Sequence, residues 1–169
     1  CREAGAAPNS LRRVANTVVA GADQYESLNI VLDGTQSGDD VRITSLAIAH
    51  KHTGNSFPNN LSTFKVFDGS TEVPVSGDST SCSGATCNTA ATNATTTLTI
   101  TSGDLTVSKG STKTLTIKPN VGTGATSGTF QVGCGGCVIA IDSEAQTITN
   151  TYTNTEGQIM TLASGGTLN

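Results

Sequence analysis

The chain has 169 residues and a formal net charge of −4 at pH 7, with only 13% charged and 4% aromatic residues. This length allows one well-buried core and is short for two. Phosphate binding needs clustered Lys and Arg, whereas the nine basic residues here are scattered, which argues against nucleic acid as a partner. No apolar run approaches the ~18–20 residues that a bilayer-spanning helix needs, so no membrane span is predicted.

Apolar and polar residues alternate along most of the chain, which is the period of β-strands. Residues 28–32 alternate in this way and end at the turn signal Asp33-Gly34. The next strand begins at Val41 and changes phase between Ile43 and Leu46, which predicts a β-bulge.

A hairpin is predicted where residues 63–67 end at the turn Asp68-Gly69 and residues 71–75 follow as the partner strand. Pro74 places this partner at a sheet edge, because proline donates no ladder hydrogen bond. Residues 76–93 are rich in Ser, Gly, Asn and Thr and are expected to form a loop. Further strands are predicted at residues 95–101, 105–107, 115–117, 129–132, 137–141, 146–152 and 158–163.

The predicted fold class is all-β: an Ig-like or jelly-roll β-sandwich of about 8–11 short strands separated by turns. The sequence has neither a long helical pattern nor a flexible interdomain linker. We therefore predict a single β-sandwich domain over residues 14–169, preceded by an extended N-terminal arm over residues 1–13. Within the arm, Pro8, Asn9 and Ser10 favour an extended chain over a helix.

Four segments carry a resemblance to known proteins. They are residues 18–21 (VVAG), 38–46 (GDDVRITSL), 64–69 (FKVFDG) and 107–117 (VSKGSTKTLTI). In this order they resemble the β-sandwich repeats of prokaryotic cell-surface proteins, including S-layer-like and stalk proteins. The resemblance covers residues 18–132, roughly two-thirds of the chain. It implies a β-sandwich at the cell surface and carries over no functional residues.

The chain extends beyond that pattern at both ends, with the arm over residues 1–13 and with strands after Gly133. Pilin-like filament subunits use such ends for donor-strand exchange, in which an arm of one subunit completes the sheet of the next. We therefore expect a structural subunit of an extracellular filament, pilus or surface layer that self-assembles with copies of itself by strand addition. The alternative is a cell-surface adhesin or carbohydrate-binding module, although sugar sites favour aromatic platforms and the chain has no Trp and two Tyr.

The five cysteines indicate an oxidising compartment, and the start at Cys1 without a methionine indicates a removed export signal. We therefore expect an extracellular or cell-surface location. Cys82 and Cys87 bracket a Ser/Gly-rich stretch and are predicted to staple the loop as a disulfide. One sulfur is left over from an odd number, and Cys1 is the candidate, either for lipidation or for an intersubunit disulfide.

The segment Cys134-Gly135-Gly136-Cys137 has the spacing of a redox motif, but a strand pattern follows it where that motif needs a helix. We interpret it as a two-residue hairpin that holds the two cysteines opposite one another in a disulfide. Zinc shared with the other cysteine pair is the alternative, and pairing of Cys1 with either cysteine stays open.

Other candidate sites have simpler explanations. Asn60 and Asn93 begin N-glycosylation sequons in loop-like regions. His50 and His52 lie two residues apart without a third ligand nearby, so we interpret them as a solvated strand end. Aspartates in turns are attributed to Asx turns rather than to calcium binding. They are Asp33, Asp39, Asp40, Asp68 and Asp78.

No nucleophile–base–acid set emerges from the sequence. Residues 62–65 (STFK) match the SxxK motif, but they enter a predicted strand where the nucleophile needs the start of a helix. We therefore predict no catalytic residue, no metal site and no cofactor.

Overall fold

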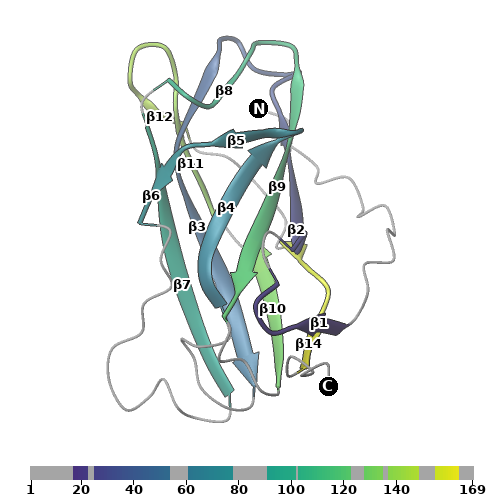
Figure 1. Cartoon of the computed structure of the whole chain (residues 1–169). Helices are drawn as coiled ribbons and strands as arrows, with labels where there is room; N and C mark the ends of the chain where they lie inside the picture. The colour runs from purple at the N-terminus through teal and green to yellow at the C-terminus, as the bar shows by residue number, and fades with distance from the viewer. Residues whose placement is uncertain are drawn as a thin grey trace.

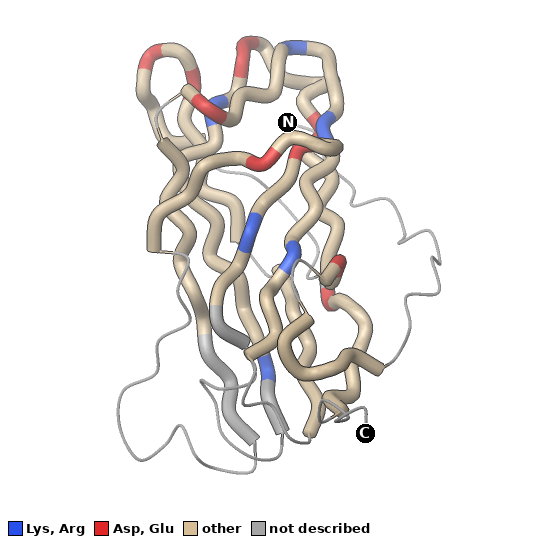
Figure 2. The backbone as a smooth tube through the Cα atoms, in the orientation of Figure 1, with Lys and Arg blue, Asp and Glu red and all other residues tan. Residues whose placement is uncertain are grey.

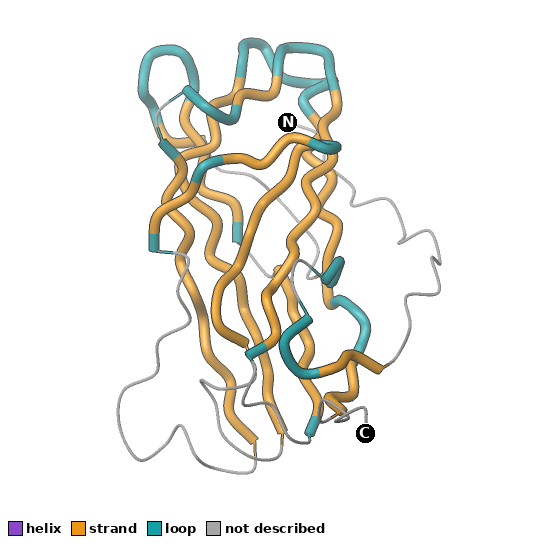
Figure 3. The backbone as a smooth tube through the Cα atoms, in the orientation of Figure 1, coloured by secondary structure: helices purple, strands orange, loops and turns teal. Residues whose placement is uncertain are grey.

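The computed structural model describes residues 17–22, 25–53, 61–77, 91–101, 103–122, 128–134, 137–148 and 155–163. These ranges contain strands and turns and no helix (Figure 3). Two sheets pack face to face around one apolar core (Figure 1). The predicted all-β sandwich is therefore confirmed.

The larger sheet, called sheet A, contains ten strands and the smaller sheet, called sheet B, contains four in the order β2-β9-β4-β5. The strands of sheet A are β1 (Thr17–Val19), β3 (Val41–Thr53), β6 (Val75–Ser76), β7 (Ala91–Ile100), β8 (Thr106–Val107), β10 (Thr129–Cys134), β11 (Val138–Ile141), β12 (Thr147–Ile148), β13 (Thr155–Glu156) and β14 (Met160–Ala163). Those of sheet B are β2 (Leu28–Asp33), β4 (Leu61–Asp68), β5 (Thr71–Val73) and β9 (Thr112–Val121).

Strand β3 is the centre of sheet A, and its neighbours on both sides are interrupted. On one side β7 pairs with residues 45–53 of β3, and β8 continues the same line along residues 41 and 42. On the other side β10 pairs with residues 49–53 and β11 with residues 42–46. Strands β13 and β14 follow β10 in the same broken manner. If β7 with β8, β10 with β11, and β13 with β14 are each counted as one interrupted strand, the fourteen described segments become eleven strands, within the predicted range of 8–11.

The core is built from the inward residues of both sheets. Strand β2 shows the predicted alternation, with Leu28, Ile30 and Leu32 buried between more exposed neighbours. Burying one such side chain is worth about 1.5–3 kcal/mol, so this alternation fixes which face of the strand turns inward. The largest fully buried side chains include Phe64, Phe130, Leu46, Ile48 and Leu98.

The predicted bulge lies in β3. Ile139 of β11 pairs with Ser45, whereas the next residue, Ala140, pairs with Ile43, so Thr44 is the extra residue. The Thr44 hydroxyl donates a hydrogen bond to the Ile139 carbonyl at 3.1 Å, which ties the bulge to its partner strand. The change of phase in the sequence thus corresponds to a real change of register.

The hairpin predicted around Asp68-Gly69 joins β4 and β5, and Gly69 adopts a positive φ of 61° in the turn. Strand β5 is an edge of sheet B, as Pro74 predicted. Pro74 also separates β5 from β6, which pairs with β7 in sheet A. The proline therefore marks the point where the chain crosses from one sheet to the other.

Two features differ from the predictions. Strand β7 begins at Ala91, although residues 76–93 were expected to form a loop. Strand β1 pairs in parallel with β14, so the first and last described strands of the chain are neighbours. No local sequence pattern predicts this pairing, because residues 17–19 and 161–163 are separated by most of the chain. The predicted arm over residues 1–13 lies outside the described residues.

Candidate functional site: sheet edges and buried polar groups

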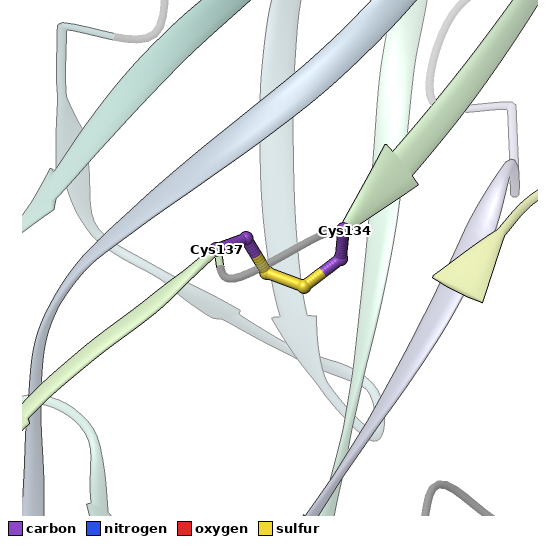
Figure 4. Close-up of a disulfide and its surroundings, with 2 residues drawn as sticks. All are labelled: Cys134 and Cys137. Carbon is purple, nitrogen blue, oxygen red and sulfur yellow. A yellow bond between two sulfur atoms is a disulfide. The ribbon is translucent and has the colours of Figure 1, made fainter. Parts of the chain in front are cut away.

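Cys134 ends β10 and Cys137 immediately precedes β11, and a disulfide joins them with a Cα–Cα distance of 5.0 Å (Figure 4). The hairpin interpretation is wrong, because β10 and β11 run in the same direction along one side of β3. Between Gly133 and Val138 the chain advances five residues while β3 advances three, from Ala49 to Leu46. The disulfide therefore closes a bulge within a strand line.

Both cysteines are buried, with relative exposures of 7% for Cys134 and 0% for Cys137. Reactive cysteines are at least partly exposed, whereas these two are buried. The arrangement suits a structural cross-link. The other three predicted cysteine sites, Cys1, Cys82 and Cys87, lie outside the described residues, as does Asn60.

His50 is a core residue, so its interpretation as part of a solvated strand end is wrong. Its side chain is 3% exposed, its Nε2 lies 2.9 Å from the Thr96 hydroxyl, and its ring centroid lies 5.3 Å from that of Phe64. Burial lowers the pKa of His50 to about 4, because the low-dielectric core disfavours the charged ring. His50 is therefore neutral at pH 7. The side chain of His52 lies outside the described residues.

The sequence did contain a signal for this burial. Leu46, Ile48 and His50 have the same parity in one strand, and side chains at alternate positions share a face of the sheet. Two of the three are fully buried aliphatic residues. Continuing the alternation by one step would have placed the histidine inside.

The Asx-turn interpretation is confirmed at Asp33, whereas Asp40 and Asp68 contact residues far away in the sequence, and Asp78 lies outside the described residues. The Asp33 carboxylate accepts hydrogen bonds from the Thr35 backbone N–H at 2.9 Å and from its hydroxyl at 2.6 Å, and these bonds lower the pKa of Asp33. Asp40 accepts a bond from the Lys109 N–H at 2.8 Å, and Asp68 pairs with Lys113. Acidic residues gather in the loops at one end of the molecule (Figure 2).

No group of three or more His, Cys, Asp or Glu side chains in the described residues is arranged to hold a metal ion. The SxxK segment lies in β4, where its Lys65 forms an ion pair with Glu72 at 3.3 Å. Among the described residues, no helix is long and apolar enough to cross a membrane.

Most sheet edges in the described part of the chain carry a feature that limits pairing with another strand. Strand β5 has three residues and is followed by Pro74, while β1 and β12 have three and two residues. Strand β2 ends in exposed Asp33. Short strands, prolines and charges are the devices with which proteins protect edges.

Strand β7 has none of these devices. It is ten residues long and contains no charged residue and no proline. One side pairs with β3 over residues 91–99, while the other side pairs only at Thr99 and Ile100 with β6. Along residues 91–98 the described structure places no strand on this outer side. This stretch, named the β7 edge, is the site best suited to binding another chain.

Two contacts show which backbone groups the β7 edge presents. The N–H of Ala47 in β3 donates to the Cys137 carbonyl, on the side of β3 away from β7. Thr97 lies opposite Ala47, and in an antiparallel pair of this type the backbone N–H and C=O of both residues face outward, so those of Thr97 point away from β3. A Cβ placed on Gly77 would lie 2.8 Å from the Thr97 carbonyl oxygen, so this oxygen faces outward and the Gly77 backbone already lies against it. Thr95, two residues earlier, has the same orientation.

The side chains of β7 divide cleanly between the two faces of the sheet. Thr95 and Thr97 are exposed, whereas Thr96 and Leu98 are buried. Asn93 lies in β7 opposite Lys51, so the prediction that its sequon lies in a loop-like region is wrong, and its side chain is outside the described part. A glycan at Asn93 and a strand added to this edge would compete for the same region.

Comparison of the chain with protein families, curated proteins and solved structures finds no match. The functional argument therefore depends on the fold and its edges.

Proposed function

We propose that the protein is a structural subunit of an extracellular filament, pilus or surface layer, and that copies of it assemble by strand addition. The β7 edge carries this proposal. Its outward backbone groups lie along residues 91–96 of an uncharged strand, before the positions that Gly77 and β6 cover, and an edge of this kind is a template for pairing with another chain.

The rest of the molecule supports this function. The resemblance of residues 18–132 to β-sandwich repeats of prokaryotic cell-surface proteins implies a surface location. A buried disulfide between Cys134 and Cys137 suits a protein that matures in an oxidising compartment. His50 and Thr96, the buried polar side chains among the described residues, are hydrogen-bonded to each other and shielded from solvent. Their arrangement favours a structural role over a catalytic one.

The proposal is tested by imaging the purified full chain by electron microscopy and measuring its mass by analytical ultracentrifugation over a wide range of concentrations. We expect concentration-dependent association into ordered polymers or sheets. A second sample treated with reductant tests whether a cysteine outside the Cys134–Cys137 pair links subunits. Monodisperse monomers at every concentration would contradict the proposal, and a glycan-binding screen would then test the adhesin alternative.

Hydrogen exchange on the assembled material gives a further readout. The Thr95 N–H points away from β3, and no described strand lies opposite it, so we expect it to exchange faster in a monomer than the amides bonded to β3 and to become protected when a strand is added. Protection at this amide on assembly is the expected result. Assembly without any new amide protection at a sheet edge would show that the subunits associate by a different mode.

A further inference from the structure

We propose that the outer face of sheet B binds acidic carbohydrate, with Lys65 and Lys118 holding an oxyanion of the ligand and Phe67 receiving a sugar ring. This inference goes beyond the proposed function, because it concerns the face of sheet B and does not require the subunits to associate. It gives the protein a ligand of defined chemistry, which is a polysaccharide that carries carboxylate or sulfate groups.

The two lysines lie directly opposite each other in the interior of sheet B. Lys65 of β4 is the antiparallel partner of Lys118 of β9, and these strands are the central pair of the sheet (Figure 1). Phe64 and Val66 belong to the core, so the alternation of β4 turns Lys65 to the outer face, and its cross-strand partner lies on the same face. Side chains in such a pair have Cβ atoms about 4.5–5.5 Å apart, so both ammonium groups can reach one oxyanion.

This pair breaks a rule of strand pairing, because like charges directly opposite each other destabilise a sheet. Glu72 compensates in part, through an ion pair with Lys65 at 3.3 Å, but neither ion pair in the described part of the chain includes Lys118. The Glu72 side chain is 50% exposed, and a ligand can compete with an ion pair of this kind. An oxyanion shared by both lysines would relieve their repulsion. Such departures from local rules are concentrated at functional sites.

Lys118 covers an aromatic ring instead of pairing with an acid. Phe67 follows the same alternation as Lys65 and therefore lies on the outer face, where the Lys118 Nζ is 4.4 Å from its ring centroid. The ring is 7% exposed in this arrangement. A cation–π contact at a surface is weak, so Lys118 can turn to a bound oxyanion and uncover the ring. An uncovered aromatic face is the kind of surface on which the apolar side of a sugar ring packs.

Fixed polar groups border the ring on the side of β2. Thr116 lies opposite Phe67, and its hydroxyl donates to the Asn29 Oδ1 at 2.8 Å. The Asn29 Nδ2 donates in turn to Glu26 at 2.9 Å. An amide oxygen has a second lone pair and an amide nitrogen a second N–H, so Asn29 retains capacity to bond sugar hydroxyls. A simple anion would use only the lysines, whereas an acidic sugar uses the lysines, the ring and the amide.

Calorimetric titration of the full chain at low salt tests the site. The probes are oligogalacturonate, which carries carboxylates, and dextran sulfate, which carries sulfates. We expect saturable binding of at least one probe, and we expect Lys65→Gln and Lys118→Gln each to weaken it at least about tenfold, because each removes a charge-assisted hydrogen bond. Added salt should weaken binding further. Neutral galacto-oligosaccharides of the same length should not bind.

The matched control is Lys113→Gln, which removes one positive charge from the same strand. Lys113 has the opposite parity from Lys118, lies opposite the core residue Leu32 and forms an ion pair with Asp68 at 2.7 Å. The control variant should bind the probe like the unmodified chain. Equal losses in the Lys113 and Lys118 variants would show that the probe responds only to net charge, and would overturn the site.

Phe67→Leu separates recognition of the sugar from recognition of the anion. It should weaken binding of the oligosaccharide several-fold and leave the chemical-shift response of Lys118 to inorganic sulfate unchanged. In the unmodified chain, nuclear Overhauser effects between the Phe67 ring and sugar C–H protons give a second readout. Full binding by the Phe67 variant together with the absence of these effects would refute the carbohydrate assignment.

The outcomes separate this inference from the proposed function. If the unmodified chain binds neither probe, the inference fails, and the proposed function is unaffected because association is measured without carbohydrate. If the chain stays monomeric but binds a probe through Lys65 and Lys118, the proposed function fails and this inference holds.

Discussion

Sheet A and sheet B differ in how continuously their strands pair. In sheet B, β9 pairs with β2 over six successive positions without a shift and with β4 over most of its length, with one irregularity at its end near Leu61. In sheet A, every strand line beside the central β3 is broken, and β3 itself carries the bulge at Thr44. The same chain thus builds one continuous sheet and one interrupted sheet.

The comparison shows that interruptions of the strands in sheet A are accompanied by specific local features. Two of the three breaks in sheet A, and the bulge, are accompanied by a local device: the Thr44 hydroxyl at the bulge, the Cys134–Cys137 disulfide between β10 and β11, and Gly157 between β13 and β14. Sheet B relies on alternation and on surface pairs such as Lys65–Glu72, each worth less than about 1 kcal/mol. Stability in sheet A should therefore depend on a few specific residues.

The largest effect is expected at Gly157. A Cβ at this position would meet the Ser27 carbonyl oxygen closer than real Cβ atoms approach, and would lie 2.9 Å from the Val132 carbonyl oxygen. Both obstacles are backbone atoms, so Gly157→Ala should cost about 3 kcal/mol and lower Tm by about 6–12 °C. Thermal unfolding followed by circular dichroism measures this. The control is Gly38→Ala, where an added Cβ has nothing within 4 Å. Equal effects of the two substitutions would refute the steric argument.

The next effect is a pH dependence from His50, which contacts Phe64 across the two sheets. Its pKa is lowered from 6.5 to about 4 in the folded protein, so the unfolded chain binds more protons between these values. This contribution to stability is complete above pH 6.5 and is lost as pH falls toward 4. At pH 5 the loss is about 2 kcal/mol relative to pH 7.

Urea unfolding at pH 7 and pH 5 tests this dependence. The comparison variant is His50→Leu/Thr96→Val, which replaces both hydrogen-bonding partners with apolar groups of similar size. We expect the variant to lose most of the pH 5 to pH 7 difference that the unmodified chain shows. The same difference in both proteins would mean that other groups govern stability in this range.

The third effect concerns the disulfide. The cross-link closes a very short loop, so the chain-entropy account gives it at most about 2 kcal/mol. Cys134→Ala/Cys137→Ala should therefore lower the free energy of unfolding by that amount or less, measured by urea denaturation at pH 7. Hydrogen exchange should increase at the amides of β11 before those of β2. Increased exchange in sheet B first would contradict the local role assigned to this bond.

Much of the fold could be predicted from local alternation. The buried positions of β2 and the bulge in β3 leave a period-two signature within a few residues, and the hairpin at Gly69 leaves a local turn signal. The candidate site was harder to predict. The β7 edge is defined by the absence of a neighbour, and neighbours are set by contacts between distant parts of the chain.

The prediction of a hairpin at residues 134–137 was wrong for the same reason: it depends on contacts between distant parts of the chain. Two glycines between strand patterns are a local turn signal, but the direction of the following strand depends on where it pairs. Here both flanking strands pair with β3, and that pairing keeps the chain moving in one direction. The error at His50 was different, because the strand alternation that buries it was present in the sequence.

The parallel pairing of β1 with β14 has a mechanical consequence. Thr17, Val18 and Val19 lie opposite Thr161, Leu162 and Ala163. Tension applied to the chain before β1 and after β14 would pull these strands in opposite directions along their length. All the hydrogen bonds between them would then be loaded in shear at once, instead of opening one after another like a zipper. Resistance to such pulling is governed by the rate of unfolding, and shear loading slows it. A subunit held under tension at a surface would benefit from having its terminal strands arranged in this way.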